Sequence, residues 1–380
     1  MKAPAAAALS LAMFVEAVGY GMVAPTLPFL AKGMGAGETG VGLLVGLYAA
    51  AGLLASLPLA SLGDRLGRRP LILAGLAAVS LASIGFVSAP SYAWLVAIRF
   101  AQGLGATAIW VGSLTLAGDL AGETSMARSL AWITGSWSLG FVLGPALGGV
   151  GGSVTTPFLI YAGLSALGWI AAWWVLPESR VRHEPIRLRD LREILGRRPV
   201  WSSAAVTFSL AFFFAALDAF LPLLAAEAGL SRGRIGLLFA IAGIPAIALP
   251  RLVGGIADRF GDRRALHAGL GYAVLFCFCF PWLFRALPDW LLFLMIGLVD
   301  VLIYVPAVAM LHRGLPNRER AFATASHSYA FSAGFFSGPL VGGVAMGVAS
   351  YEALFPTLAA VLVACAALLR KPRAPSAIPA

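Results

Sequence analysis

Four ionisable side chains lie well inside long apolar segments of this sequence: Glu16, Arg99, Asp218 and Asp300. A charged side chain at the centre of a bilayer costs about 2.5–3.5 kcal/mol on insertion scales, so it faces a partner or a water-filled cavity. Such residues mark proton relays and the pathways of ions and solutes. The sequence therefore predicts one proton-coupling or substrate cavity that these four residues share.

Depth along each apolar segment ranks the three acids. At about 1.5 Å per helical residue, Glu16 and Asp300 lie roughly 15 Å from the start of their segments, near the midplane. Asp218 lies roughly 27 Å along its segment, close to the outer mouth. Glu16 is thus the first candidate for the proton carrier, Asp300 the second and Asp218 the weakest. The alternative is that these groups make unspecific polar contacts.

Aromatic side chains gather on segments that are expected to line the same cavity. A cavity with aromatic walls and a few acids suits amphipathic or cationic solutes. The alternative is that these rings pack against lipid or neighbouring helices. The candidates for the cavity wall are Trp110, Phe208, Phe212 and Phe331, with His327 as an unranked extra.

The elements that position these residues follow from composition. Of 380 residues, 60% are hydrophobic and only 12% are charged. A soluble domain carries about 25% charged residues, so lipid must cover much of the exterior. A membrane-spanning helix needs about 20 apolar residues, and we predict an all-α membrane protein with twelve transmembrane helices. The apolar runs lie near residues 5–31, 38–61, 70–88, 91–118, 125–150, 156–176, 200–226, 234–256, 264–285, 290–312, 319–347 and 352–370.

The net charge of +10 is a signal of topology rather than of nucleic-acid binding. If the N-terminus is cytoplasmic, the basic clusters between apolar runs fall inside, as the positive-inside rule requires. Among residues between the spans, only Lys32, Arg232, Arg234 and Arg285 then fall outside. We therefore predict a multi-pass protein of the inner (plasma) membrane with both termini in the cytoplasm.

The two halves of the chain resemble each other at one fixed offset. Residues that match lie 194 positions apart in three places: Pro28 and Pro222, Asp64 and Asp258, and Gly140 and Gly334. Duplicated helical bundles with a solute site between them are a known transporter plan. The predicted parts are an N-terminal six-helix bundle (1–177), a basic cytoplasmic linker (178–199), a C-terminal six-helix bundle (200–372) and a C-terminal tail (373–380).

The loop after the second apolar run carries a longer motif. Ala60-Ser-Leu-Gly-Asp-Arg-Leu-Gly-Arg-Arg69 resembles G-x-L-A-D-R-x-G-R-[KR], the signature of the major facilitator superfamily, although it departs at Ala60 and Gly63. The resemblance implies the major facilitator fold and a loop that holds the inner gate closed in the outward-facing state. The alternative is a basic loop that only sets topology. The gating residues so implied are Asp64, Arg65, Gly67, Arg68 and Arg69, with Asp258 and Arg259 in the second copy, where Asp262 replaces a basic residue.

Three further elements resemble that superfamily, and two of them resemble its antiporter branches. Arg99 opens the superfamily's R-x-x-Q-G-x-G-A element, whose arginine the resemblance links to proton transfer; the alternative is a structural tie to backbone carbonyls. The first apolar run is similar to the first helix of tetracycline-type antiporters, which carry an acid in the position of Glu16. A glycine–proline motif implies a tight, bendable contact between the halves, or a simple packing motif. Its residues are Gly140, Gly144, Pro145 and Gly149, repeated at Gly338 and Pro339.

These patterns predict a secondary active transporter. The sequence has no G-x-x-x-x-G-K-[ST] phosphate loop, so a proton gradient is the expected energy source, without a cofactor or a metal. We predict proton-coupled efflux of small amphipathic or cationic compounds by a monomer that alternates access. The alternatives are a carrier for a metabolite, sugar, siderophore or lipid, and a non-transporting receptor or scaffold. An enzyme is disfavoured because the four histidines are dispersed.

Overall fold

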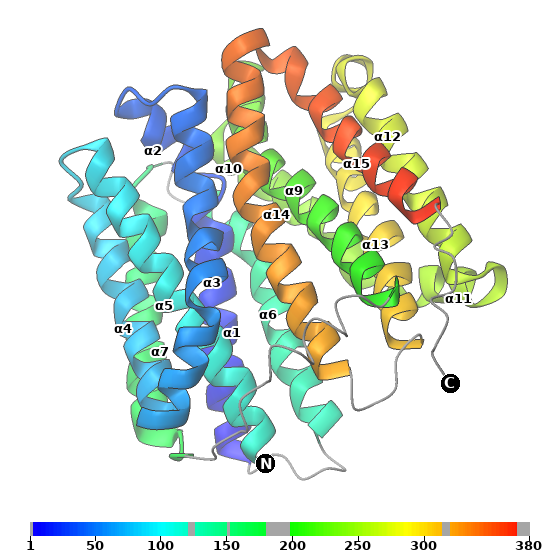
Figure 1. Cartoon of the computed structure of the whole chain (residues 1–380). Coiled ribbons are helices and arrows are strands. Elements are labelled where there is room, and N and C mark those ends of the chain that lie inside the picture. Colours follow the sequence, from blue (N-terminus) through cyan, green and yellow to red (C-terminus); the bar gives the residue numbers. More distant parts are fainter. Residues whose placement is uncertain (1–2, 121–125, 150–152, 180–197, 314–319, 371–380) are drawn as a thin grey trace, which may run out of the picture.

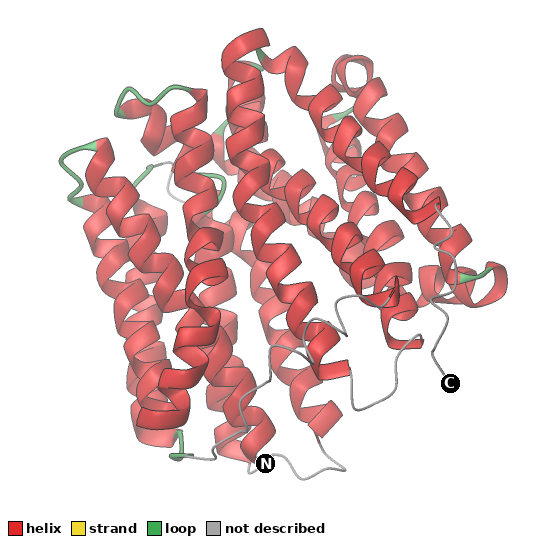
Figure 2. Cartoon of the chain, in the orientation of Figure 1, coloured by secondary structure: helices red, strands yellow, loops and turns green. Residues whose placement is uncertain are grey.

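The computed structural model describes residues 3–120, 126–149, 153–179, 198–313 and 320–370, and this part of the chain is helical without strands (Figure 2). Most of the predicted linker and the whole predicted tail lie outside the described residues. The first half contains α1 (Ala3–Val23), α2 (Leu27–Gly33), α3 (Glu38–Leu66), α4 (Arg68–Val87), α5 (Tyr92–Leu120), α6 (Met126–Gly149) and α7 (Thr156–Val175).

The second half repeats this arrangement. It contains α9 (Arg198–Glu227), α10 (Arg232–Ala248), α11 (Pro250–Phe260), α12 (Asp262–Ala286), α13 (Asp289–Arg313), α14 (Arg320–Ala349), the short 3-10 helix η2 (Tyr351–Ala353) and α15 (Leu354–Arg370). In Figure 1 α3, α4, α5 and α7 of the first half lie on the left, and α12, α13 and α15 of the second half lie on the right.

The spans agree with the twelve predicted apolar runs. Ten described helices are long and apolar enough to cross a membrane, and the pair α10–α11, bent by 47°, makes an eleventh span. The remaining predicted run, at 125–150, corresponds to α6, which has 24 residues. The chain is therefore an all-α membrane protein with twelve transmembrane segments in two pseudo-symmetric six-helix bundles.

Two interruptions were not predicted, and prolines stand at both. The first run breaks after Val23, next to Pro25, and continues as α2. The eighth run breaks at Leu249, and Pro250 is the first residue of α11. A proline lacks the amide hydrogen of a helix interior but suits the first position of a new helix. Hydropathy does not detect such breaks because the residues around them remain apolar.

Backbone contacts join the two halves at the end where α3 and α10 begin. A Cβ atom on Gly42 of α3 would lie 2.0 Å from the carbonyl oxygen of Pro339 on α14. The matching Gly236 of α10 would place its Cβ 2.2 Å from the carbonyl oxygen of Pro145 on α6. Only glycine fits backbones that approach so closely. These two contacts, which we call the glycine seam, obey the same 194-residue offset as the sequence repeats.

The glycine–proline motif of α6 has two faces rather than one contact between the halves. Gly140 and Gly144 pack on α1 within the first half, where added Cβ atoms would lie 2.6 and 2.5 Å from the carbonyl oxygens of Phe14 and Val18. On α14, Gly338 packs likewise against α9, where an added Cβ atom would lie 2.2 Å from the carbonyl oxygen of Phe212. The later residues Pro145 and Gly149, and Pro339 in α14, meet the opposite half.

Candidate functional site

Glu16 lies on α1 with only 4% of its surface exposed. Its carboxylate accepts one hydrogen bond from the hydroxyl of Tyr48 on α3 and a second, of 2.9 Å, from Nε1 of Trp137 on α6. Burying a carboxylate is costly unless donors replace the lost water, and hydrogen bonds to a charged acceptor are the strong ones. Three helices of the first half therefore stabilise this acid inside the bundle.

Arg99 on α5 is fully buried and lies beside the same group. Its Nη1 donates a hydrogen bond of 2.6 Å to Oε1 of Gln102, the glutamine of the motif. Its guanidinium carbon lies 4.7 Å from the ring centre of Tyr48 and 5.9 Å from that of Tyr20. Arginine stacks on aromatic faces in this way. Within the described part of the chain, Nε and Nη2 of Arg99 have no hydrogen-bond acceptor.

Asp218 extends this group across the interface between the halves. The hydroxyl of Tyr20 on α1 donates a hydrogen bond of 3.0 Å to Oδ2 of Asp218 on α9, and both residues are buried. Arg99 acts electrostatically on Asp218 as well as on Glu16. The partner of Asp218 thus comes from α1 of the other half, which depth along α9 does not reveal. We call Glu16, Tyr20, Tyr48, Arg99, Trp137 and Asp218 the acid network.

Asp300 does not join the acid network, although the sequence grouped it with Glu16. It lies on α13 in a second group within the second half. Tyr304, one helical turn away, interacts electrostatically with Asp300, and its ring centre lies 5.9 Å from that of His327 on α14. The structure therefore brings three of the four predicted ionisable residues together and leaves the fourth apart.

Aromatic rings connect the two halves beside the acid network. Neighbouring ring centres lie 5.2–5.8 Å apart. Two of the four predicted aromatics, Trp110 and Phe331, belong to this row. The other two, Phe208 and Phe212, contact each other on α9 instead, with ring centres 6.1 Å apart. In spatial order the row contains Trp110, Trp137, Phe141, Tyr20, Phe335 and Phe331, with Tyr48 beside Tyr20.

Sequence reasoning missed Tyr20, Tyr48 and Trp137, which all donate to a buried acid. Tyrosine and tryptophan count as apolar in a hydropathy scan, yet their polar atoms need partners when buried. Tyr20 lies four residues after Glu16, so the two share one face of α1. A search for hydroxyl or indole donors at that spacing from a buried acid would have found Tyr20 but not its partner on α9.

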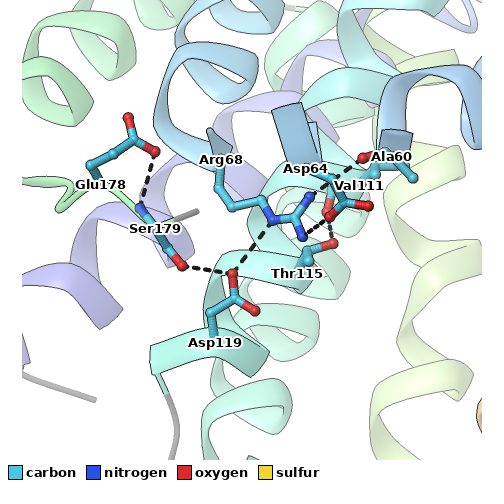
Figure 3. Close-up of polar contacts among 8 residues, drawn as sticks. All are labelled: Ala60, Asp64, Arg68, Val111, Thr115, Asp119, Glu178 and Ser179. Atoms are coloured by element: carbon cyan, nitrogen blue, oxygen red, sulfur yellow. Dashed lines mark hydrogen bonds and ion pairs between the residues drawn. The ribbon is translucent and has the colours of Figure 1, made fainter. Parts of the chain in front are cut away.

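The predicted gating loop forms a second polar cluster, shown in Figure 3. Arg68 is almost completely buried; it binds Asp64, and its Nε lies 3.4 Å from Oδ2 of Asp119 on α5. Ser179, which follows α7, donates a hydrogen bond of 2.8 Å to the same oxygen of Asp119. The carbonyl oxygen of Ser179 accepts a further hydrogen bond, of 3.2 Å, from the backbone amide of Arg68. The motif therefore ties three helices and the start of the linker together.

The other gating candidates differ in their burial. Arg65 is exposed, whereas Arg69 donates to the carbonyl oxygen of Trp173 and lies 5.3 Å from the centre of its ring. Gly67 joins α3 to α4 with φ of 106°, a left-handed value that favours glycine. In the second copy both Asp258 and Arg259 are exposed. The two copies therefore differ in burial as well as in sequence.

Twelve transmembrane segments in two related bundles, with buried ionisable residues between them, define a transporter class rather than a soluble enzyme. The chain belongs to the Major Facilitator Superfamily, whose family model matches residues 9–325. The family and fold are those of membrane transporters of small molecules.

Several relatives are drug-resistance proteins. The chain is 30% identical over 349 residues to the class C tetracycline resistance protein of Escherichia coli, covering 86% of each chain. It is 23% identical to multidrug resistance protein 2 of Bacillus subtilis, over 87% of this chain and 86% of that one. It is 28% identical to a chloramphenicol resistance protein of Pseudomonas aeruginosa, over 70% of this chain and 66% of that one.

Solved structures share the fold at lower identity. The nucleoside transporter NupG, as a D323A mutant, superposes with a TM-score of 0.79 at 12% identity, covering 96% of this chain and 98% of that one. An inward-facing bacterial homologue of the human lysosomal transporter Spinster superposes with a TM-score of 0.76 at 15% identity, covering 97% and 96%.

Proposed function

We propose that this chain is a proton-coupled antiporter that exports small amphipathic or cationic compounds by alternating access. The observation that carries the proposal is the acid network, which holds one acid in each half and one arginine between them. Similarity to tetracycline, multidrug and chloramphenicol resistance proteins supports efflux as the direction and drugs as the class of solute.

The charges of the acid network favour coupling to a proton. With Glu16 and Asp218 ionised, the network carries one negative charge more than Arg99 compensates. One bound proton makes it neutral, and neutral groups cost less in a membrane interior. A hydrogen bond to a carboxylate is about twice as strong as one to a neutral acceptor. Protonation of Asp218 therefore weakens its bond to Tyr20 and loosens the contact between the halves.

A proton gradient is sufficient to drive such an exchange. One elementary charge that crosses 100 mV releases about 2.3 kcal/mol, which corresponds to roughly a fifty-fold concentration ratio of a solute. In the proposed cycle a proton enters from outside and binds Glu16 or Asp218. The solute leaves while the network is protonated, and the proton is released to the cytoplasm.

The orientation in the membrane is part of the same proposal. Cytoplasmic termini in the inner membrane place the Arg68 cluster of Figure 3 on the cytoplasmic side and the glycine seam on the outer side. The cluster around Arg68 then stabilises the inner ends of α3, α4 and α5 as one unit. We propose that this unit is the first-half part of the inner gate, that the bundles have the boundaries 1–177 and 200–372, and that the transporter is a monomer.

The direct test is transport by reconstituted protein. Proteoliposomes with an imposed pH gradient should accumulate or release a fluorescent drug with the wild-type chain. Glu16→Gln should lose pH-driven transport while it retains exchange of solute without a gradient. Glu352→Gln removes the same charge from an exposed position on η2 and should transport normally. Full pH-driven transport by Glu16→Gln would contradict the assigned role of Glu16.

A further inference from the structure

A second polar group lies in the second half, apart from the acid network. It contains residues from three helices: Thr207 on α9, Asp300 and Tyr304 on α13, and His327 on α14. Nδ1 of His327 lies 2.8 Å from Oγ1 of Thr207, and the rings of Tyr304 and His327 meet at 5.9 Å between centres. These contacts fix the positions of His327 and Tyr304 relative to each other.

Asp300, which is partly buried, differs from Glu16 and Asp218 in its lack of donors. Glu16 accepts two hydrogen bonds and Asp218 accepts one. Among the residues that the structure describes, Asp300 accepts none and takes part in no ion pair. A carboxylate within an apolar helix is costly without a donor or a cation. A cationic group on a bound solute would supply the counter-charge that Asp300 lacks.

Two aromatic rings near His327 are partly exposed. Tyr304 is 44% exposed and Phe331, one turn after His327 on α14, is 43% exposed. The contact of Tyr304 with His327 directs its ring towards α14, and α14 packs against α3 of the other half. The ring of Tyr304 therefore lies beside α14, the helix of the second half that packs against α3 of the first. Ring faces attract organic cations, with about 0.5–2 kcal/mol for each contact.

We propose that Asp300 and Tyr304 form a subsite for the charged group of an organic cation. Asp300 supplies the counter-charge, and Tyr304 supplies a ring face over which an ammonium or phosphonium group lies. The subsite deepens the proposed export function and rests on it for its role in transport. It also gives the acids different roles, since Glu16 and Asp218 exchange the proton while Asp300 recognises the charge of the solute.

The test is equilibrium binding to the purified full-length chain at one mildly alkaline pH. Tetraphenylphosphonium is a permanent cation, and triphenylphosphine oxide offers similar rings without charge. Asp300→Asn should weaken binding of the cation about tenfold, since one charge contact is worth at least about 1.4 kcal/mol, and should change binding of the neutral compound less than about twofold. Asp300→Glu should restore most of the affinity for the cation.

Ring variants and a charge control complete the experiment. Tyr304→Phe should bind the cation as the wild type does, whereas Tyr304→Leu should bind it about threefold more weakly. Glu352→Gln removes one exposed negative charge and should bind both probes normally. Thermal melting of each variant shows whether it folds.

Three results would overturn the subsite: no binding of tetraphenylphosphonium by the wild-type chain, unchanged affinity in Asp300→Asn, or an equal loss for both probes. Failure of the proposed function looks different. If proton-driven export is absent but cation affinity still depends on Asp300, the subsite stands and the antiport proposal fails.

Discussion

Tyr20 and Asp218 form a hydrogen bond of 3.0 Å that joins α1 of the first half to α9 of the second. Tyr20 also lies over Arg99, which interacts with Glu16 and Asp218 alike. A change of charge on either acid thus acts on a contact between the bundles. Alternating access requires the bundles to move relative to each other, and we propose that this pair connects the state of the acids to the position of the halves.

Tyr20→Phe tests this connection. The variant keeps the ring that packs against Phe141 and Phe335 but loses the hydroxyl that binds Asp218. A hydrogen bond to a charged group contributes about 1.5–3 kcal/mol. We expect pH-driven accumulation in proteoliposomes to fall about tenfold while solute exchange without a gradient continues. Undiminished pH-driven accumulation would show that the cross-half bond has no part in coupling.

Arg99→Lys tests whether the shape of the cation matters as well as its charge. Lysine cannot reproduce the planar group that binds Gln102 and stacks on Tyr48. We expect pH-driven transport to fall at least about tenfold even though the net charge is unchanged. Arg251→Lys, at an exposed position on α11, is the matched control and should transport normally. Wild-type rates for Arg99→Lys would reduce its role to that of a point charge.

Gly42→Ala tests the glycine seam. The new methyl group would lie 2.0 Å from the carbonyl oxygen of Pro339, so α3 and α14 must separate. Overpacking of this kind costs about 1–3 kcal/mol. We expect spin labels near the start of α3 and near the end of α14 to report longer distances. Gly271→Ala is the control, because a Cβ atom added there would meet nothing within 4 Å beyond its own helix backbone, and it should leave the distances unchanged. Equal distances in both variants would argue against the seam.

Arg68→Ala tests the cluster at the end of α5. Removal of one partner from a buried ion pair costs about 3–5 kcal/mol because the remaining charge is left uncompensated. Arg68 and Asp119 have side chains only 2% and 3% exposed, so they count as a buried ion pair. We expect a clear fall in the melting temperature of Arg68→Ala in detergent. Arg65→Ala, three residues earlier and exposed, should melt as the wild type does. Equal melting of the two variants would exclude a structural role for Arg68.

The sequence by itself determined the membrane class, the number of spans and the duplication. These are local properties: an apolar run of sufficient length becomes a helix in lipid wherever its neighbours are. The loop motif and the insertion cost of charge also identified Arg68, Glu16, Arg99 and Asp218 as residues that need partners.

Only the tertiary structure decided which partners they have. Asp218 meets Tyr20 because α1 and α9 approach each other at that depth, while Asp300 lies on α13, which packs against α9, α10, α11 and α12 of its own half. Asp119 and Ser179 join Arg68 from positions far along the chain. Side-chain direction depends on how each helix is rotated about its axis, and helix packing fixes that rotation, not the hydropathy of the helix itself.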